Sequence, residues 1–180
     1  MRVGILSVYI IHIMAGYHTK TFSKHDDYQS PKSAWENITH LIPKVEIWEA
    51  FYGNGDSGKY LTELGFQTIH EDIDFFENDR GECVVSNPPY TLCPQILTRL
   101  VELNKPFILI MPAGKLHTQY FRKLFSNADD PIQIIIPRKR IQFVKTVDGE
   151  VPKDYKSDCN FDCYYYCWKM NLPRDIVWLE

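Results

Sequence analysis

The sequence lacks the features that mark several common classes of protein. It has no large excess of charge of either sign, because its formal net charge is −3. A polycationic chain that binds nucleic acid over its whole surface is therefore excluded, and any such binding must come from local patches. It has no internal repeat and no domain linker. With 180 residues, of which 44% are hydrophobic, the chain suits a single globular domain with a proper core.

Paired cysteines are also absent. The five cysteines form no CxxC pair. An odd number without paired spacing fits free thiols in a reducing compartment. That compartment would be the cytoplasm or nucleoplasm, and it would belong to the host cell if the protein is viral. Cys159, Cys163 and Cys167 follow one another at intervals of four residues, CxxxCxxxC. The radical-type iron–sulfur signature, CxxxCxxC, has one residue fewer between its second and third cysteines. Even spacing on a strand places them on one face. We therefore predict buried thiols and no metal site.

The N-terminus has an apolar run that is too short to span a bilayer. This run, Val3–Met14, contains His12 and is followed by no AxA-type cleavage site. We expect residues 1–20 to be a dispensable extension with Met14 as an alternative initiator, and targeting is the less favoured alternative. Residues 21–180 are expected to form a single folded domain, without membrane association.

A strand that runs into a stiff polar turn is the most informative stretch. Val84 and Val85 are typical of the end of a buried strand. The prolines of Asn87-Pro88-Pro89-Tyr90 end it, because they cannot donate to a ladder and they hold the preceding residues extended. The turn therefore offers an amide, a bare carbonyl and an aromatic ring at a strand's C-terminal edge, where open α/β sheets bind ligands.

Methylation of an exocyclic amine suits this turn. Such a nitrogen is a poor nucleophile, since its lone pair is delocalised into a ring or a carbonyl. The Asn87 side-chain oxygen and the Pro88 carbonyl would accept its two N–H bonds and localise the lone pair, and Tyr90 would stack on the planar substrate and aim the nitrogen at a methyl sulfonium. No strong general base is required. Without this chemistry the turn is only a proline-stiffened loop.

Asn87-Pro88-Pro89-Tyr90 after a hydrophobic strand resembles the catalytic motif of S-adenosylmethionine-dependent amino-methyltransferases, especially phage-type DNA adenine-N6 enzymes. The resemblance spans residues 28–168, and its specific motifs are this turn and a glycine loop before it. It implies that these four residues are catalytic and that Asn87 also contacts the cofactor. It also implies the class I methyltransferase fold, a three-layer α/β/α Rossmann-like fold with a mostly parallel sheet and an antiparallel last strand.

The glycine loop lies between a strand expected over Val45–Trp48 and a helix expected over Ser57–Leu64. Its glycines permit tight turns and let a ligand lie against bare backbone. The loop fits three templates. One is a dinucleotide fingerprint, Gly53-x-Gly55-x-x-Gly58, with Asp72 near the sequence separation expected of the residue that binds the ribose. The others are a phosphate-binding loop ending in Gly58-Lys59, with Tyr60 in place of Ser/Thr, and the methyltransferase form, Glu49-x-x-x-Gly53-x-Gly55.

The rest of the chain chooses among these templates. A phosphate-loop enzyme needs an Asp at the end of a hydrophobic strand to hold magnesium, and neither Cys83–Val85 nor Phe107–Met111 is followed by one. A nicotinamide site leaves the proline turn unexplained. The methyltransferase form alone uses both segments, and in it the acidic residue, Glu49, helps to seat the methionine part of S-adenosylmethionine.

The resemblance also assigns segments on either side of the glycine loop to the cofactor. Tyr28-Gln29-Ser30-Pro31 is similar to a segment that covers the methionine end, although it could simply start a helix from Pro31 to His40, with Ser30 as its cap and Pro31 at its first position. The predicted cofactor-binding residues are Tyr28, Ser30, Pro31, Glu49, Phe51, Gly53, Gly55, Asp72, Asp74, Phe75 and Asn87.

The acidic turn after the second strand, Phe66–His70, is assigned to the nucleoside part. Asp72 would accept both ribose hydroxyls as a bidentate acceptor, and Asp74 and Phe75 would contact the adenine amine and the adenine face. The alternative is an exposed acidic turn with Phe75 or Phe76 packed beneath it.

The remaining pattern predicts alternating helices and strands. Helices are expected over Cys93–Leu103 and Lys115–Phe125, strands over Phe107–Met111, Ile132–Ile136 and Phe161–Trp168, a mobile loop over Thr146–Asp158 and a tail over Asn171–Glu180. Between the last two strands, basic residues surround an aromatic ring, which predicts contacts to phosphates and a base by Arg138, Lys139, Arg140, Phe143 and Lys145. Surface charge beside a sheet edge is the alternative.

The expected reaction is methyl transfer from S-adenosylmethionine to adenine N6 in nucleic acid, with DNA favoured over RNA. Only residues 146–158 offer room for target recognition, so relaxed sequence preference, a single-stranded or RNA substrate, or a partner subunit that supplies recognition are all open. Protein-glutamine methylation is a second possibility, because those enzymes share the motif. A non-catalytic subunit that keeps the fold is the third.

Overall fold

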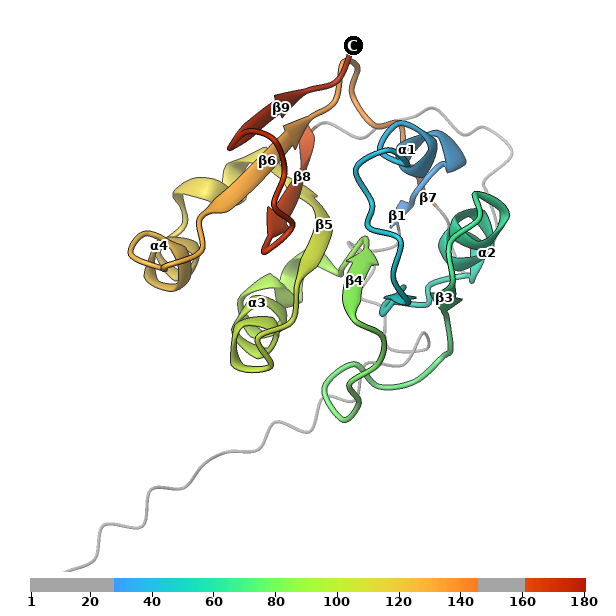
Figure 1. Ribbon diagram of the computed structural model, residues 1–180, viewed down its shortest axis with the longest axis horizontal. Helices are drawn as coiled ribbons and strands as arrows, with labels where there is room; N and C mark the ends of the chain where they lie inside the picture. Colours follow the sequence, from blue (N-terminus) through green and yellow to red (C-terminus); the bar gives the residue numbers. More distant parts are fainter. Residues whose placement is uncertain (1–27, 146–160) are drawn as a thin grey trace, which may run out of the picture.

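The computed structural model describes residues 28–145 and 161–180. Seven strands form one sheet in the order β3-β2-β4-β5-β8-β6-β9 (Figure 1). Strand β8 is antiparallel to both of its neighbours, whereas every other adjacent pair is parallel. The strands are β2 Ile47–Trp48, β3 Thr68–Ile69, β4 Cys83–Ser86, β5 Phe107–Pro112, β6 Ile132–Ile136, β8 Cys163–Trp168 and β9 Ile176–Trp178.

Alternation along the central strand builds two separate cores. Phe107, Leu109 and Met111 of β5 belong to one core, and Ile108 and Ile110 belong to the other, as expected for a strand buried on both faces. Helices α3 (Cys93–Glu102) and α4 (Gln119–Phe125) cover the first face, and α1 (Lys32–Glu36) and α2 (Asp56–Glu63) cover the second (Figure 1). The predicted three-layer α/β/α fold class is confirmed.

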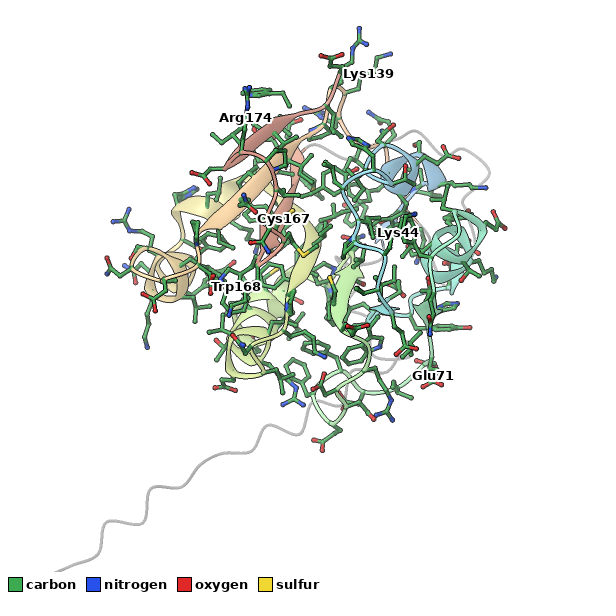
Figure 2. All side chains as sticks on the ribbon, viewed as in Figure 1. Lys44, Glu71, Lys139, Cys167, Trp168 and Arg174 are labelled. Atoms are coloured by element: carbon green, nitrogen blue, oxygen red, sulfur yellow. The ribbon has the colours of Figure 1, made fainter. Side chains whose placement is uncertain are left out.

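Side chains of neighbouring residues therefore enter opposite cores. Cys167 and Trp168 are adjacent in β8 (Figure 2), and Cys167 packs with Cys163 in the core under α1 and α2, while Trp168 packs under α3 and α4. Cys163 and Cys167 are buried free thiols, as the even spacing predicts. Cys159 lies outside the described residues.

A short ribbon stands apart from the main sheet. Strand β1 (Tyr28–Gln29) pairs antiparallel with β7 (Val144–Lys145), so that Tyr28 lies opposite Lys145 and Gln29 opposite Val144. This ribbon carries the start of the segment that leads into α1. It brings two parts of the chain together that are more than a hundred residues apart in sequence.

The N-terminal helix and its cap were predicted wrongly. Helix α1 ends at Glu36 and residues 37–41 continue as turns. Pro31 precedes the first helical residue as the N-cap, and no side chain caps the helix. The Ser30 hydroxyl is buried and has no hydrogen-bond partner within the described residues, so it does not take the capping role. Pro31 is extended, with ψ 154°, which turns the preceding backbone away from the helix axis.

Two further elements differ from the prediction. The helix expected over Lys115–Phe125 is broken at Thr118, whose backbone is extended and whose hydroxyl donates to the Lys115 carbonyl at 2.7 Å; this side-chain bond replaces a helical one. A 3₁₀ helix, η3 (Ala113–His117), precedes the break. The tail expected over Asn171–Glu180 contains β9, which pairs with β6. Val177 of β9 and Leu179, which follows the strand, pack against the core.

The loop predicted over Thr146–Asp158 and the N-terminal extension lie outside the described residues. Within the described ranges, 28–145 and 161–180, no helix is long and apolar enough to cross a membrane.

Candidate active site

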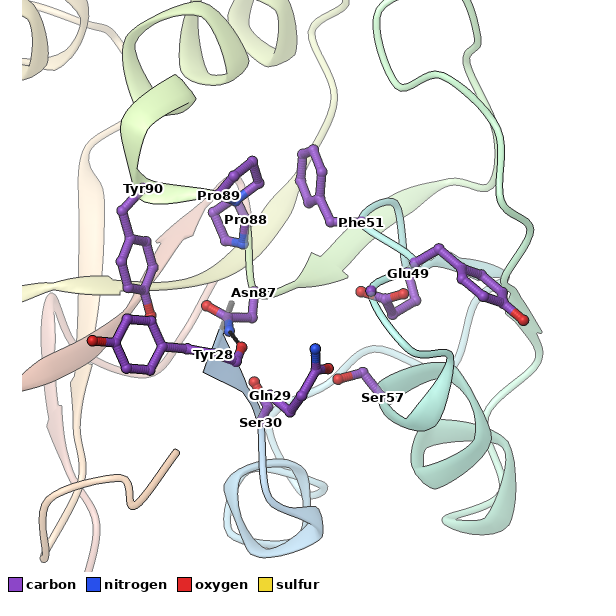
Figure 3. Close-up of a pocket in the computed structure, with 12 residues that line it drawn as sticks. Tyr28, Gln29, Ser30, Glu49, Phe51, Ser57, Asn87, Pro88, Pro89 and Tyr90 are labelled. Atoms are coloured by element: carbon purple, nitrogen blue, oxygen red, sulfur yellow. Dashed lines mark hydrogen bonds between the residues drawn. The ribbon is translucent and has the colours of Figure 1, made fainter. Parts of the chain in front are cut away.

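A cleft lies where the glycine loop and the proline turn meet. Strands β2 and β4 are parallel neighbours, with Trp48 opposite Val84, so the segments that follow them leave the sheet at the same edge. Residues 28–30, which lead into α1, close the cleft from the α1 side (Figure 3). Its lining residues are Tyr28, Gln29, Ser30, Glu49, Phe51, Tyr52, Gly53, Ser57, Asn87, Pro88, Pro89 and Tyr90.

The Asn87 amide is anchored on its nitrogen side. Its Nδ2 donates a hydrogen bond to the Tyr28 carbonyl at 3.2 Å (Figure 3). Its Oδ1 is buried and has no hydrogen-bond partner within the described residues. Pro88 and Pro89 are both buried, so the turn has little freedom to move. The structure thus holds an acceptor oxygen in place with its lone pairs unused.

Tyr90 is the first residue of the 3₁₀ helix η2 (Tyr90–Leu92) and sits in an aromatic wall. Its ring meets Phe161 edge-on, with centroids 5.7 Å apart, and its hydroxyl lies 3.5 Å from the Cys163 sulfur. Lys115 Nζ donates to the Tyr90 carbonyl at 3.0 Å. Tyr28 also packs edge-on against Phe161, at 5.5 Å. The ring of Tyr90 is therefore held at the cleft while half-buried.

The glycines of the loop have the backbone that the sequence predicts. Gly53 and Gly55 have φ of 58° and 86°, which favours residues without a Cβ. A Cβ on Gly53 would lie 3.2 Å from the Gln29 amide oxygen, and one on Gly55 would lie 3.0 Å from the Tyr52 hydroxyl. Gly55 also stands at the N-cap of α2. Gly53 faces the cleft, whereas Gly55 shapes the loop behind it.

Glu49 is a buried carboxyl group beside the loop. It is 1% exposed, and Ser86 Oγ donates to its Oε1. Burial raises the pKa of Glu49 to about 8, although hydrogen bonds from the Ser86 hydroxyl and the Phe51 backbone partly oppose that shift. Its second oxygen, Oε2, is buried without a hydrogen-bond partner within the described residues.

Three residues that line the cleft each carry a buried polar atom without a hydrogen-bond partner within the described residues: Ser30 Oγ, Glu49 Oε2 and Asn87 Oδ1. Buried polar atoms are almost always hydrogen-bonded in folded proteins, and exceptions mark sites completed by water, an ion or a ligand. The carboxyl group of Glu49 and the hydroxyl of Ser30 suit the ammonium end of an amino-acid ligand, Gly53 adds bare backbone, and the Asn87 amide oxygen is left for a second group. The residues present therefore fit the methionine end of S-adenosylmethionine.

The space in the cleft is small, and the Gln29 side chain lies in it. The free volume is about 20 Å³, enough for about one water molecule. Figure 3 shows the Gln29 side chain lying toward Ser57, and its amide oxygen occupies the space where a Cβ on Gly53 would point. A ligand of the size of S-adenosylmethionine therefore requires Gln29 to turn away.

The residues assigned to the nucleoside part lie outside this cleft. Asp72 is exposed, and Asp74 Oδ1 accepts the Phe76 backbone N–H at 2.8 Å, which stabilises the local turn. Phe75 is fully buried, stacked on Trp48 at 5.5 Å and tilted against Phe51 at 4.9 Å. The expected contact of Phe75 with an adenine face is therefore corrected to a packing role, because its ring is already enclosed by other rings.

The basic segment is exposed but its aromatic ring is not. Arg138, Lys139 and Arg140 are exposed, and Arg140 pairs with Asp162 at 2.8 Å. Phe143 is 1% exposed and belongs to the core under α1 and α2, so the expected stacking role of Phe143 is wrong. The side chain of Lys145 lies outside the described part of the chain.

The three exposed basic residues line a second, wider groove. Its volume is about 920 Å³, and it runs between α1 and the end of β9, with Glu180 as an acidic residue in its wall. Pro31 lines this groove and its neighbour Ser30 lines the cleft. Pro31 therefore contributes to the wall between them and not to the cleft itself.

Several residues at the site carry no motif that sequence reasoning could detect. Gln29 and Ser57 line the cleft, Ser86 binds Glu49 and Lys115 holds the Tyr90 carbonyl. His70 lies beside Glu49, with 3.9 Å between Nδ1 and Oε2. His70 and Glu49 come together through the register of β2 with β3, which pairs Trp48 with Ile69.

Comparison with known proteins adds little. Neither a family model nor a curated protein matches the sequence. A solved structure from Listeria monocytogenes, described as a candidate class I S-adenosylmethionine-dependent methyltransferase, is similar with a TM-score of 0.46 and 12% sequence identity, over 88% of this chain and 67% of that chain. At this level the similarity carries no conclusion about function, which must come from the site.

Proposed function

We propose that the protein transfers a methyl group from S-adenosylmethionine to the exocyclic N6 amine of adenine in nucleic acid, with DNA favoured over RNA. The observation that carries this proposal is the unpartnered Oδ1 of Asn87, which Tyr28 holds in place through the other end of the amide. Asn87 begins the turn that continues through Pro88, Pro89 and Tyr90, and all four residues line the cleft.

The turn acts on the lone pair of the substrate nitrogen. Asn87 Oδ1 accepts one N–H of the amine and the Pro88 carbonyl accepts the other, which draws the lone pair out of the adenine ring. Tyr90 stacks on the base and fixes its angle. In a duplex the adenine must first leave the stack, because its N6 is otherwise out of reach.

The glycine loop and Glu49 hold the methyl donor. When it is bound, S-adenosylmethionine supplies an electrophilic methyl group. Glu49 Oε2 and Ser30 Oγ accept hydrogen bonds from its ammonium group, and Gly53 lets its chain lie against the backbone. Asp72 is exposed in the turn after β3, at the same edge of the sheet, and it remains the residue proposed to bind the ribose.

The basic groove supports a polyanionic substrate. Arg138, Lys139 and Arg140 follow β6, are exposed, and lie in a groove whose wall continues into the cleft through Pro31 and Ser30. Phosphate contacts of this kind give affinity that is independent of sequence. A separate target-recognition subunit remains part of the proposal, because the described residues contain no insertion that would read bases.

The experiment measures transfer of labelled methyl groups into separate DNA, RNA and protein pools. We expect N6-methyladenine in DNA with the wild-type protein and a loss of about 10²–10³-fold with Asn87→Ala, the size expected for removing one positioned hydrogen-bonding group. Gln95→Ala, an exposed substitution on α3, serves as the matched control and should transfer normally. Full activity of Asn87→Ala would rule the mechanism out.

Methylation of a protein glutamine is the second candidate, and one observation favours it. The unpartnered Asn87 Oδ1 offers the same acceptor to the nitrogen of a glutamine carboxamide as to an adenine amine. Label recovered from protein as N5-methylglutamine, with none in either nucleic acid, would select this function. Failure to bind S-adenosylmethionine would select the non-catalytic subunit.

A further inference from the structure

His70 lies beside Glu49 of the cleft, and the proposed function uses Glu49 but gives no role to His70. Trp48 of β2 lies opposite Ile69 of β3, so the next residues, Glu49 and His70, leave the sheet side by side. The distance from His70 Nδ1 to Glu49 Oε2 is 3.9 Å. Within the described residues neither atom has a hydrogen-bond partner.

The ring of His70 is fixed by the glycine loop and by α2. It stacks on Tyr52 of the loop with centroids 4.7 Å apart and an angle of 14° between the planes. A Cβ on Gly58 of α2 would lie 2.1 Å from His70 Cγ, so only glycine leaves room for the ring there. His70 therefore touches both elements that shape the proposed cofactor site.

Few charged groups face this pair. Ser86 and the Phe51 N–H bind Glu49, and Lys59 and Asp56 of α2 act on His70 in opposite directions, Lys59 lowering its pKa and Asp56 raising it. Burial, the largest cause in both cases, raises the pKa of Glu49 to about 8 and lowers the pKa of His70. Near neutral pH the ligand-free pair therefore holds one proton, and Glu49 carries it.

That proton conflicts with the binding of a cation. A protonated carboxyl group gains little from an ammonium group, so the O–H bond of Glu49 must break when one binds. His70 Nδ1 is an acceptor 3.9 Å from Glu49 Oε2, and the His70 side chain is 17% exposed against 1% for Glu49. An approach of about 1 Å would bring the two atoms to hydrogen-bond distance.

We propose that Glu49 passes its proton to His70 when the ammonium group of the methyl donor binds, which makes His70 the positioning residue that keeps this site able to bind a cation at neutral pH. This inference rests on the proposed function, because it needs a cofactor with an ammonium group. In the transfer the Glu49 O–H bond breaks and an N–H bond forms at Nδ1. The carboxylate then lies between two cations, and little or no proton is released to solvent.

The test counts protons during binding of S-adenosylhomocysteine to the full chain. Calorimetry in two buffers of different ionisation enthalpy at pH 7 should show release of far less than one proton by the wild-type protein. His70→Phe keeps a ring for Tyr52 but removes the acceptor, so it should release about one proton and bind about tenfold more weakly at pH 7 than at about pH 9. His117→Phe, at an exposed histidine of η3, is the matched control.

Nitrogen-15 NMR of the wild-type imidazoles gives a second reading that needs no variant. Binding should move the His70 ring signals to the imidazolium position and leave those of His117 unchanged. Equal proton release by the wild-type and His70→Phe proteins, or a His70 signal that stays neutral, would overturn the inference while leaving the cofactor intact. Absence of any S-adenosylhomocysteine binding by the wild-type protein would overturn both.

Discussion

The side-chain nitrogen of Asn87 donates a hydrogen bond to the backbone carbonyl of Tyr28, at 3.2 Å. The bond joins the proline turn after β4 to the short strand β1, two segments that are 59 positions apart in the sequence. It fixes the direction of the amide, so that Oδ1 and not Nδ2 is left without a partner. Tyr28 of β1 therefore fixes the orientation of Asn87 Oδ1, the acceptor on which the proposed chemistry depends.

Replacing Asn87 by aspartate tests this bond through stability. Asp has no N–H to donate, so a carboxylate oxygen would face the Tyr28 carbonyl and repel it. We expect Asn87→Asp to lower the free energy of unfolding by about 1–3 kcal/mol, measured by urea denaturation at pH 7. Unchanged stability would mean that the Asn87–Tyr28 bond does not anchor the turn.

Glu49 should make stability depend on pH. Its pKa is about 8 in the folded protein and 4.5 as the ordinary value, so between these values the folded state holds a proton that the unfolded state releases. The contribution to stability is complete below pH 4.5 and is lost as the pH rises to about 8, with a slope of at most about 1.4 kcal/mol per pH unit.

Glu49→Gln removes that titration. Urea denaturation from pH 5 to pH 8.5 should show a stability that falls with pH in the wild-type protein and falls less in the variant. Parallel curves for the two proteins would contradict a raised pKa at Glu49.

Gln29 should hinder entry of the cofactor. Its side chain fills the cleft over Gly53, so the conformation that can bind is only a fraction of the population, and the apparent affinity is reduced by that fraction. Gln29→Ala should bind S-adenosylhomocysteine on the order of tenfold more tightly, mainly through faster association in stopped-flow experiments. Gln95→Ala should match the wild-type protein, and a Gln29→Ala variant that does the same would place the cofactor elsewhere.

The basic groove makes a prediction about salt. Each lost phosphate contact lowers the slope of log K against log salt by about 0.9, so the double variant Arg138→Ala with Lys139→Ala should bind DNA with a slope smaller by about 2. Phe143→Ala should leave the slope unchanged and cost about 3–5 kcal/mol of stability instead, because Phe143 is a core residue. An unchanged slope in the double variant would exclude the groove from phosphate binding.

The fold was predictable because its signals are local. The run Phe107–Met111 is apolar at every position, which suits a strand buried on both faces, and the prolines after Val85 prevent β4 from continuing. Strand β9 was missed although residues 176–179 are apolar, because so short a run predicts little by itself and its pairing with β6 is a tertiary choice.

The candidate site was predictable only in part. The proline turn and the glycine loop meet because the strands before them are neighbours, as the resemblance implies. An aromatic residue such as Phe75 or Phe143 has the same letter whether its ring faces a ligand or the core, so its role could not be read from sequence. The pairing of His70 with Glu49 depends on strand register, which has no sequence signal here.

The most direct test of the central claim follows one variant through two steps. Asn87→Ala should bind S-adenosylmethionine within a few-fold of the wild-type protein, and its transfer of methyl groups to adenine N6 of DNA should fall by about 10²–10³-fold. Retained binding with lost transfer would support Asn87 as the residue that activates the amine. Transfer at the wild-type rate by Asn87→Ala would contradict the account.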